Sequence, residues 1–100
     1  MGELSIFDPT FDNLTRAVDV SAQIQATRAH NIANSNTPGY EAMEFDAELG
    51  KAVKRADKKE VILEEEIAAM TENSIKYSAY IKFLSSKLNI LRSIVTQGRK

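Results

Sequence analysis

The most regular pattern in the chain is a heptad repeat of apolar residues in its C-terminal part. Apolar side chains recur there in alternating steps of four and three, the spacing of a helix face that packs against other helices. The members are Leu63, Ile67, Met70, Tyr77, Ile81, Leu84, Leu88, Leu91 and Val95, with Ser74 as the polar one. We therefore expect a long helix from about Glu64 to Gln97, roughly 51 Å at 1.5 Å per residue, with an assembly seam along these residues.

Residues beside this seam add two expectations. Glutamates gather near the start of the expected helix and basic residues follow later, which suits the helix dipole. They are Glu64, Glu65, Glu66 and Glu72, then Lys82, Lys87, Arg92 and Arg99. Further apolar residues off the seam are Tyr80, Phe83, Ile90 and Ile94. A simple two-helix hairpin would leave these in water, so further partners are expected.

A second helix is expected in the N-terminal part, from Asp8 and Pro9 to about Asn34. Asp8 can cap free amides, and Pro9 lacks an N–H where none is needed. One apolar stripe contains Phe11, Leu14, Val18, Ala22, Ala29 and Ile32, and another contains Val20, Ile24 and Thr27. Two stripes indicate more than one neighbour. The alanines Ala22, Ala26, Ala29 and Ala33 either form an edge that another backbone can approach closely, or are simply good helix formers.

The middle of the chain breaks the helical pattern. Pro38 disfavours helix at the residue before it, and Pro38-Gly39 suits the centre of a type II turn. From Tyr40 to Phe45 a weak alternation is compatible with an extended segment. Residues 47–60 carry charges of both signs, typical of a solvated loop or a short polar helix.

These elements predict an all-α fold in which long N- and C-terminal helices pack as a coiled-coil-like hairpin with an irregular or short extended connection. We expect one domain over residues 1–100: an N-terminal helix over 1–34, a turn and variable connection over 35–60, and a C-terminal heptad helix over 61–100.

Composition narrows the function classes. A formal net charge of −1 gives no field for a phosphate backbone, so nucleic-acid binding is not expected. With no cysteine, thiolate metal sites and thiol nucleophiles are excluded. His30 stands alone, and the glycines form no phosphate-binding loop. We expect no enzyme activity, cofactor, metal or small-molecule substrate, and the N-terminal residues do not read as a cleaved signal peptide.

The segment at the end of the first helix resembles the signature shared by flagellar rod and hook proteins. Its members are Asn31, Ile32, Ala33, Asn34, Thr37, Pro38, Gly39 and Tyr40. Residues 66–77 and 84–92 are similar to the C-terminal helix of the proximal-rod subunit in the flagellar basal-body rod family. The resemblance covers residues 10–46 and 61–99, and the middle is shorter than usual for that family.

The resemblance implies a structural subunit of the proximal rod, which assembles through its terminal helices into a tubular axial structure that transmits torque for motility. The implied partners are copies of the chain, other flagellar rod proteins, and the membrane-ring and export-gate components of the basal body. The implied location is the rod within the cell envelope, reached by type III export without a cleaved signal peptide. From the residues alone, a small coiled-coil adaptor or chaperone in a closed complex with one partner remains an alternative.

Overall fold

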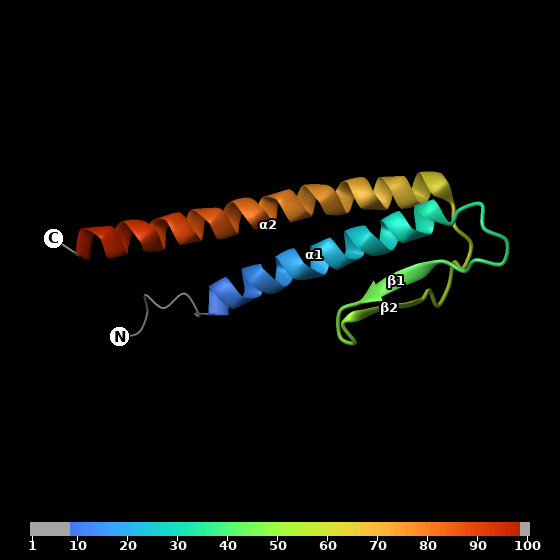
Figure 1. Cartoon of the computed structure of the whole chain (residues 1–100), viewed down its shortest axis with the longest axis horizontal. Helices are drawn as coiled ribbons and strands as arrows, with labels where there is room; N and C mark the ends of the chain where they lie inside the picture. The colour runs from blue at the N-terminus through green and yellow to red at the C-terminus, as the bar shows by residue number, and fades with distance from the viewer. Residues whose placement is uncertain (1–8, 99–100) are drawn as a thin grey trace.

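The computed structural model describes residues 9–98 as two helices separated by a β-hairpin (Figure 1). Helix α1 spans Pro9–Ala33, strands β1 and β2 span Met43–Asp46 and Lys51–Lys54, and helix α2 spans Leu63–Gly98. The two helices lie side by side and run in opposite directions, so the molecule is elongated, 64 × 23 × 16 Å. The chain is mostly helical, as the sequence predicts, but the hairpin adds a small sheet to the expected all-α fold.

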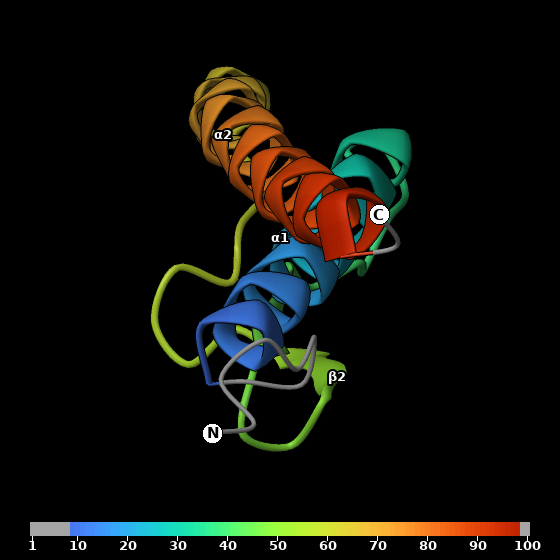
Figure 2. The same ribbon diagram turned by 90° about the vertical axis from the view of Figure 1, so that its left-hand side faces the viewer.

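Helix α1 lies between α2 and the hairpin, as two perpendicular views show (Figures 1 and 2). This arrangement gives α1 more than one neighbour within its own chain. Its end at Ala33 agrees with the predicted end near Asn34, and the predicted cap at Asp8 lies outside the described residues. Most members of the first expected stripe are half-buried, whereas Ala22 and Ala29 are exposed, and the buried positions of α1 include Ser21 and Asn31.

A β-hairpin occupies residues 43–54, so β1 overlaps the segment expected to be extended and β2 replaces part of the loop or short polar helix expected over residues 47–60. Met43 pairs with Lys54 and Asp46 with Lys51 in an antiparallel register. The Asp46 carboxylate accepts the amides of Glu48 and Leu49 at 2.9 and 3.0 Å, and Gly50 takes a φ of +70°. An acceptor at the start and a glycine at the end let the chain reverse here. The charge pattern could not indicate this, because pairing depends on a partner strand.

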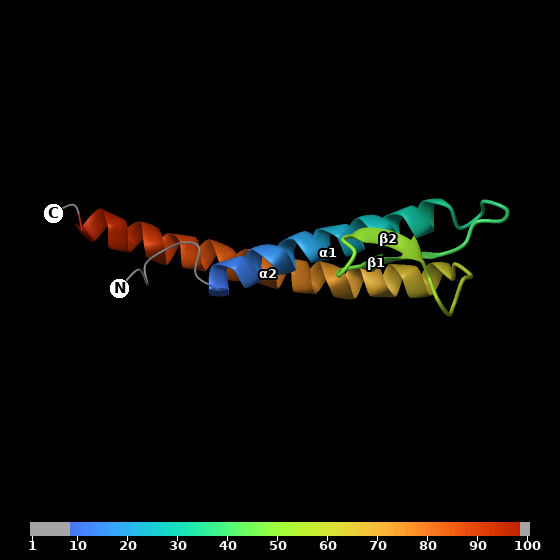
Figure 3. The same ribbon diagram turned by 90° about the horizontal axis from the view of Figure 1, so that it is seen from below.

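The long C-terminal helix is present over Leu63–Gly98, one residue longer at each end than the expected Glu64 to Gln97. Its first turn contains Glu64, Glu65 and Glu66, and the amide of Glu66 donates to the carbonyl of Ile62 at 3.0 Å. The red C-terminal end of α2 extends past the start of α1 (Figures 1 and 3). That stretch of α2 has less of α1 to pack against than the rest.

The buried residues are mainly polar. In the described part of the chain, the fully buried hydrophobic side chain is Ala42, whereas the buried polar ones are Ser21, Thr27, Asn31, Glu66 and Asn73. In these residues, every buried side-chain nitrogen and oxygen has a hydrogen-bond partner. Burial of so many polar groups is tolerable only when they are paired. Specific hydrogen bonds, rather than a large apolar core, therefore define how the elements meet.

Candidate assembly surface

The Pro-Gly segment forms a tight turn soon after α1. The amide of Tyr40 donates to the carbonyl of Thr37 at 3.2 Å, which closes the turn around Pro38 and Gly39. Gly39 has a φ of +79°, the left-handed value that the third residue of a type II turn requires. Both observations agree with the turn that the sequence predicts.

Other signature residues complete the end of α1. The side-chain amide of Asn34 donates to the carbonyl of His30 at 2.9 Å, and the Thr37 hydroxyl donates to Asn34 Oδ1 at 3.1 Å. Ile32 is half-buried, while Ala33 is exposed. The Asn34 side chain thus adds a second donor to the His30 carbonyl, which already accepts the Asn34 amide, and Thr37 holds that side chain in place.

Asn31 joins four parts of the fold through one fully buried side chain. Its Nδ2 donates to the carbonyl of Met43 at 2.9 Å and to Glu66 Oε2 at 3.3 Å. Its Oδ1 accepts the Tyr40 hydroxyl at 2.6 Å and the Met43 amide at 2.9 Å. Asn31 therefore fixes α1 against the turn, β1 and α2 at once. The first and last residues of the signature bond to each other.

Glu66 is the charged centre of the same cluster. Its side chain is 1% exposed and lies between Arg28 Nη1, 3.0 Å from Oε2, and Arg55 Nη2, 2.8 Å from Oε1. Burial alone would raise the pKa of the Glu66 carboxyl, but hydrogen bonds from Arg28, Arg55 and Asn31 outweigh it and hold that pKa below its usual range. Arg55 also donates to the carbonyl of Met43 at 3.2 Å. The carboxylate thus links α1, the hairpin and α2. We call Arg28, Asn31, Tyr40, Arg55 and Glu66 the polar node.

Tyr40 closes the polar node on the side of the turn. Burial and the negative charge of Glu66 raise the pKa of the Tyr40 phenol, while Arg55 opposes this rise. The phenol therefore stays protonated and donates to Asn31. The His30 ring lies edge-on to the Tyr40 ring, with centroids 5.6 Å apart. This contact gives His30 a packing role.

The sequence does not single out Glu66 and Arg55. It places Glu66 among the glutamates that suit the helix dipole, and Glu66 does lie in the first turn of α2. It places Arg55 within residues 47–60, which are expected to be solvated, whereas Arg55 is only 11% exposed and pairs with Glu66. The burial of these two side chains is what the sequence does not indicate.

One feature of the sequence could have indicated that Glu66 is buried. Glu66 and Asn73 are seven residues apart, so they share one face of α2 with Tyr80 and Ile94. The same face carries Lys87, and polar residues in register with apolar ones are candidates for buried pairing.

That face of α2 is the one turned toward α1. Asn73 Nδ2 donates to the carbonyl of Ser21 at 2.8 Å and to Gln25 Oε1 at 2.7 Å, and Glu66 binds Arg28. We call this set the inner column; it contains Glu66, Asn73, Tyr80, Lys87 and Ile94. Of the predicted seam, Met70, Tyr77, Leu84 and Leu91 are half-buried beside it. We call these four the shared column.

The remaining seam residues are exposed. Their exposed fractions are 45% for Leu63, 48% for Ile67, 36% for Ile81, 37% for Leu88 and 55% for Val95. We call Ile67, Ser74, Ile81, Leu88 and Val95 the outer column. The predicted seam is thus divided in the monomer: its shared column lies beside the partly polar inner column, and its apolar outer column faces water. Its role in assembly stays a prediction. A helix with apolar columns on two sides has room for a second partner.

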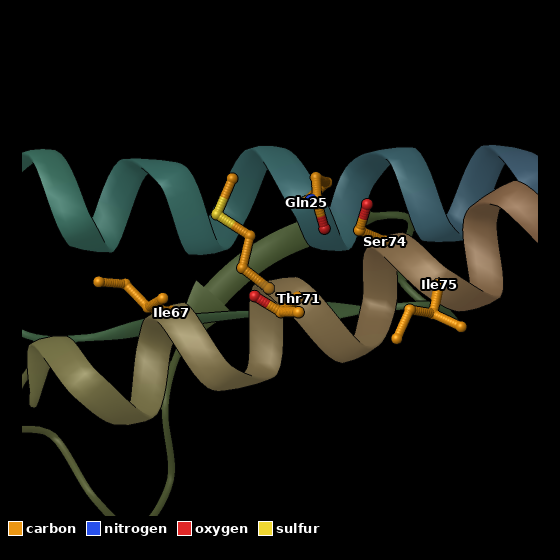
Figure 4. Close-up of a pocket in the computed structure, with 6 residues that line it drawn as sticks. Gln25, Ile67, Thr71, Ser74 and Ile75 are labelled. Atoms are coloured by element: carbon orange, nitrogen blue, oxygen red, sulfur yellow. The ribbon is translucent and has the colours of Figure 1, made fainter.

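The surface between the helices is hollowed beside the outer column. One hollow of about 350 Å³ is lined by Ala22, Gln25, Ala26, Ala29, Met70 and Tyr77. An adjoining one of about 330 Å³ includes Ile67, Ser74 and Ile75. Figure 4 shows Gln25 and Ser74 pointing into the space between α1 and α2, whereas Ile75 points away from α1. The alanine edge of α1 and the outer column of α2 thus border one shallow groove.

A third hollow, of about 450 Å³, involves other exposed apolar residues of α2. It is lined by Thr10, Leu14, Phe83, Ser86, Lys87, Ile90 and Leu91. Phe83 and Ile90 are 61% and 60% exposed. Apolar side chains therefore remain accessible on more than one side of α2.

Over residues 9–98, no group of three potential ligands could hold a metal ion, and no helix is long and apolar enough to cross a membrane. A scan against models of protein families and a search of curated proteins found no match for the chain. Candidate function therefore depends on the two features described above: the polar node and the exposed columns of α2.

Proposed function

We propose that the chain is a structural subunit of the flagellar basal-body proximal rod, in which α1 and α2 form a coiled-coil-like hairpin that assembles through its apolar columns. In this proposal, neighbouring subunits cover the outer column and the Phe83 and Ile90 side of α2. The assembled tube is an axial structure of the cell envelope that transmits torque. Its subunits leave the cytoplasm through type III export.

The observation that carries the proposal is the exposed outer column of α2. Fully burying one large aliphatic side chain stabilises a protein or complex by about 1.5 to 3 kcal/mol. A partner that covered Ile67, Ile81, Leu88 and Val95 would therefore add substantially to the free energy of association. Exposed apolar surface of this extent is typical of interaction sites. The signature turn, which resembles that of rod and hook proteins, points to the rod as the assembly concerned.

The polar node supports the same role in a different way. It fixes the turn end of the helix pair through contacts inside the chain, so the signature residues there need no partner to become ordered. The rest of α2 relies on less internal packing. Such a subunit can present a fixed end and complete its packing on its neighbours.

Imaging of basal bodies tests the proposal. The gene that encodes the chain is deleted in the cell that carries it. Basal bodies are then purified, and the rod is examined by electron microscopy. We expect the membrane ring to remain and the rod to be lost. Intact rods in the deletion strain would contradict the proposed function, provided that a complemented strain serves as the control.

A small adaptor or chaperone in a closed complex is the second candidate, because one partner helix would also cover the outer column. Open-ended growth separates the two. A rod subunit should elongate with increasing concentration or on a rod seed, whereas an adaptor should stop at a fixed stoichiometry. Light scattering against concentration distinguishes these outcomes.

A further inference from the structure

We infer that the outer column of α2 is also a homodimer interface, in which two copies of the chain pair through antiparallel α2 helices. The inference does not depend on the proposed function, because a rod subunit and an adaptor could each carry such an interface. It follows from the order of side-chain sizes and charges along one exposed face of α2.

The outer column has a second column beside it. Steps of three and four from the outer column lead to Glu64, Thr71, Ser78, Ser85 and Arg92, all of which are exposed. Three of these residues are small and uncharged, and the charged ones stand at opposite ends. We call this set the serine column. Together the two columns form one face of large apolar and small polar residues with a single charge at each end.

Size complementarity suits an antiparallel pair. In antiparallel heptad packing, layers form between the serine column of one helix and the outer column of the other. Thr71 then lies against Leu88 of the second copy, and Ser78 lies against Ile81. Large side chains meet small ones in these layers, on both sides of a two-fold axis near Ser78 and Ile81, and the layer between them pairs Ser74 with Ser85. Such alternation lets the layers interdigitate.

Charge complementarity selects the direction of the partner helix. In the antiparallel pair, Glu64 of each copy comes near Arg92 of the other, so opposite charges meet at both ends. A parallel in-register pair would place Glu64 beside Glu64 and Arg92 beside Arg92, with repulsion at both ends. The occupant that fits this face is therefore a second α2 in reverse orientation.

The rest of the molecule leaves space for this partner. The side of the groove that α1 forms is lined by three exposed alanines, Ala22, Ala26 and Ala29. Small side chains at this edge allow the second copy to approach without a clash. Because the interface is two-fold symmetric, it closes on itself and does not propagate. The dimer would cover the outer column and keep it from any assembly that uses the same surface.

Cysteine cross-linking of the purified full chain tests the geometry. The chain has no native cysteine, so Thr71→Cys and Leu88→Cys, both at exposed positions, report single sites. An equal mixture of the two variants should form a disulfide between unlike chains under mild oxidation, whereas Thr71→Cys alone should remain uncross-linked. Phe83→Cys, away from the dimer face, is the control and should also remain uncross-linked. Strong self-linking of Thr71→Cys, or no unlike-chain product from the mixture, would overturn the inference.

Charge reversal gives a second measurement that does not depend on cysteine chemistry. Glu64→Arg and Arg92→Glu should each weaken the dimer roughly 2- to 30-fold at low salt, because each affects two symmetric pairs of exposed charges. The double variant should recover most of the lost affinity, and the effect should fade at high salt. Lys76→Glu, on the same side of α2 as Phe83 and away from the dimer face, is the matched control. Sedimentation equilibrium measures all four, with helicity checked by circular dichroism; a monomeric parent, or a double variant weaker than both single ones, would contradict the antiparallel dimer.

Discussion

The two ends of the helix pair hold together through different chemistry. At the turn end, the polar node satisfies every one of its buried polar groups within the chain, through charge-assisted hydrogen bonds of 2.8 and 3.0 Å to Glu66. Along the other half of α2, large apolar side chains such as Phe83 and Leu88 remain exposed. The polar node needs no partner chain for its hydrogen bonds, whereas these apolar side chains remain in water. The contrast separates residues that fold the chain from residues available to partners.

The same comparison places the signature residues among those that fold the chain. Asn31 and Tyr40 bond to each other, and Gly39 supplies a left-handed turn residue. None of these three needs a partner chain for its role. The residues that resemble a family signature therefore specify the internal geometry of this chain, and the exposed apolar side chains lie on α2 instead.

The largest effect on the folding side is expected from Glu66→Ala. Removal of the carboxylate leaves Arg28 and the nearly buried Arg55 without their shared partner, and breaking a buried ion pair costs about 3 to 5 kcal/mol. Because Arg28 is 30% exposed and can recover hydration, we expect the free energy of unfolding to fall by an amount near the lower bound, about 3 kcal/mol. Urea denaturation measures it, and hydrogen exchange should show faster opening of the hairpin.

Glu65→Ala is the matched control. Glu65 neighbours Glu66 and forms an ion pair with Lys58, but both side chains are more than half exposed. Exposed pairs contribute about 0 to 1 kcal/mol. Equal losses from the two variants would mean that the polar node does not hold the turn end together.

Substitution of the turn glycine should have the next largest effect. Gly39→Val places a β-branched residue at a φ of +79°, at a cost of about 1 to 3 kcal/mol. An added Cβ would meet no atom within 4 Å, so the cost comes from backbone strain alone. Gly39→Asn should be milder, because asparagine tolerates this conformation better. Thermal melts of both variants measure the difference, and a fully stable Gly39→Val chain would refute the turn geometry.

Acid should weaken the turn end through Glu66. The folded pKa of Glu66 lies below its unfolded value of about 4.3. Its contribution to stability is therefore fully present above about pH 4.3 and is lost as the pH falls through the lower folded pKa. Thermal melts between neutral pH and about pH 2 should show this loss in the parent chain, and it should be smaller in Glu66→Gln. The same slope in both proteins would assign the loss to other carboxyls.

The smallest effect on folding is expected on the open side of α2. Leu88→Asp introduces a charge at a partly exposed position, so the monomer should lose no more than about 0.5 kcal/mol. Association should nevertheless be lost, because a partner would have to bury the carboxylate unpaired. Leu84→Asp, at a half-buried position of the shared column, should cost the monomer more. Denaturation and sedimentation on the two variants separate folding from assembly, and normal association of Leu88→Asp would remove the outer column from the interface.

The sequence by itself determined the two helices, the turn between them and the amount of apolar surface on α2. These features follow from local rules, because helical spacing, Pro38-Gly39 and the heptad steps act over short distances along the chain. Only the tertiary structure decided which column faces α1. Glu66 and Asn73 reach partners 38 and 48 residues away, at Arg28 and Gln25. Their hydrogen bonds turn a partly polar column inward because a buried polar group is stable only when paired. The apolar outer column is consequently left in water, where another chain can cover it.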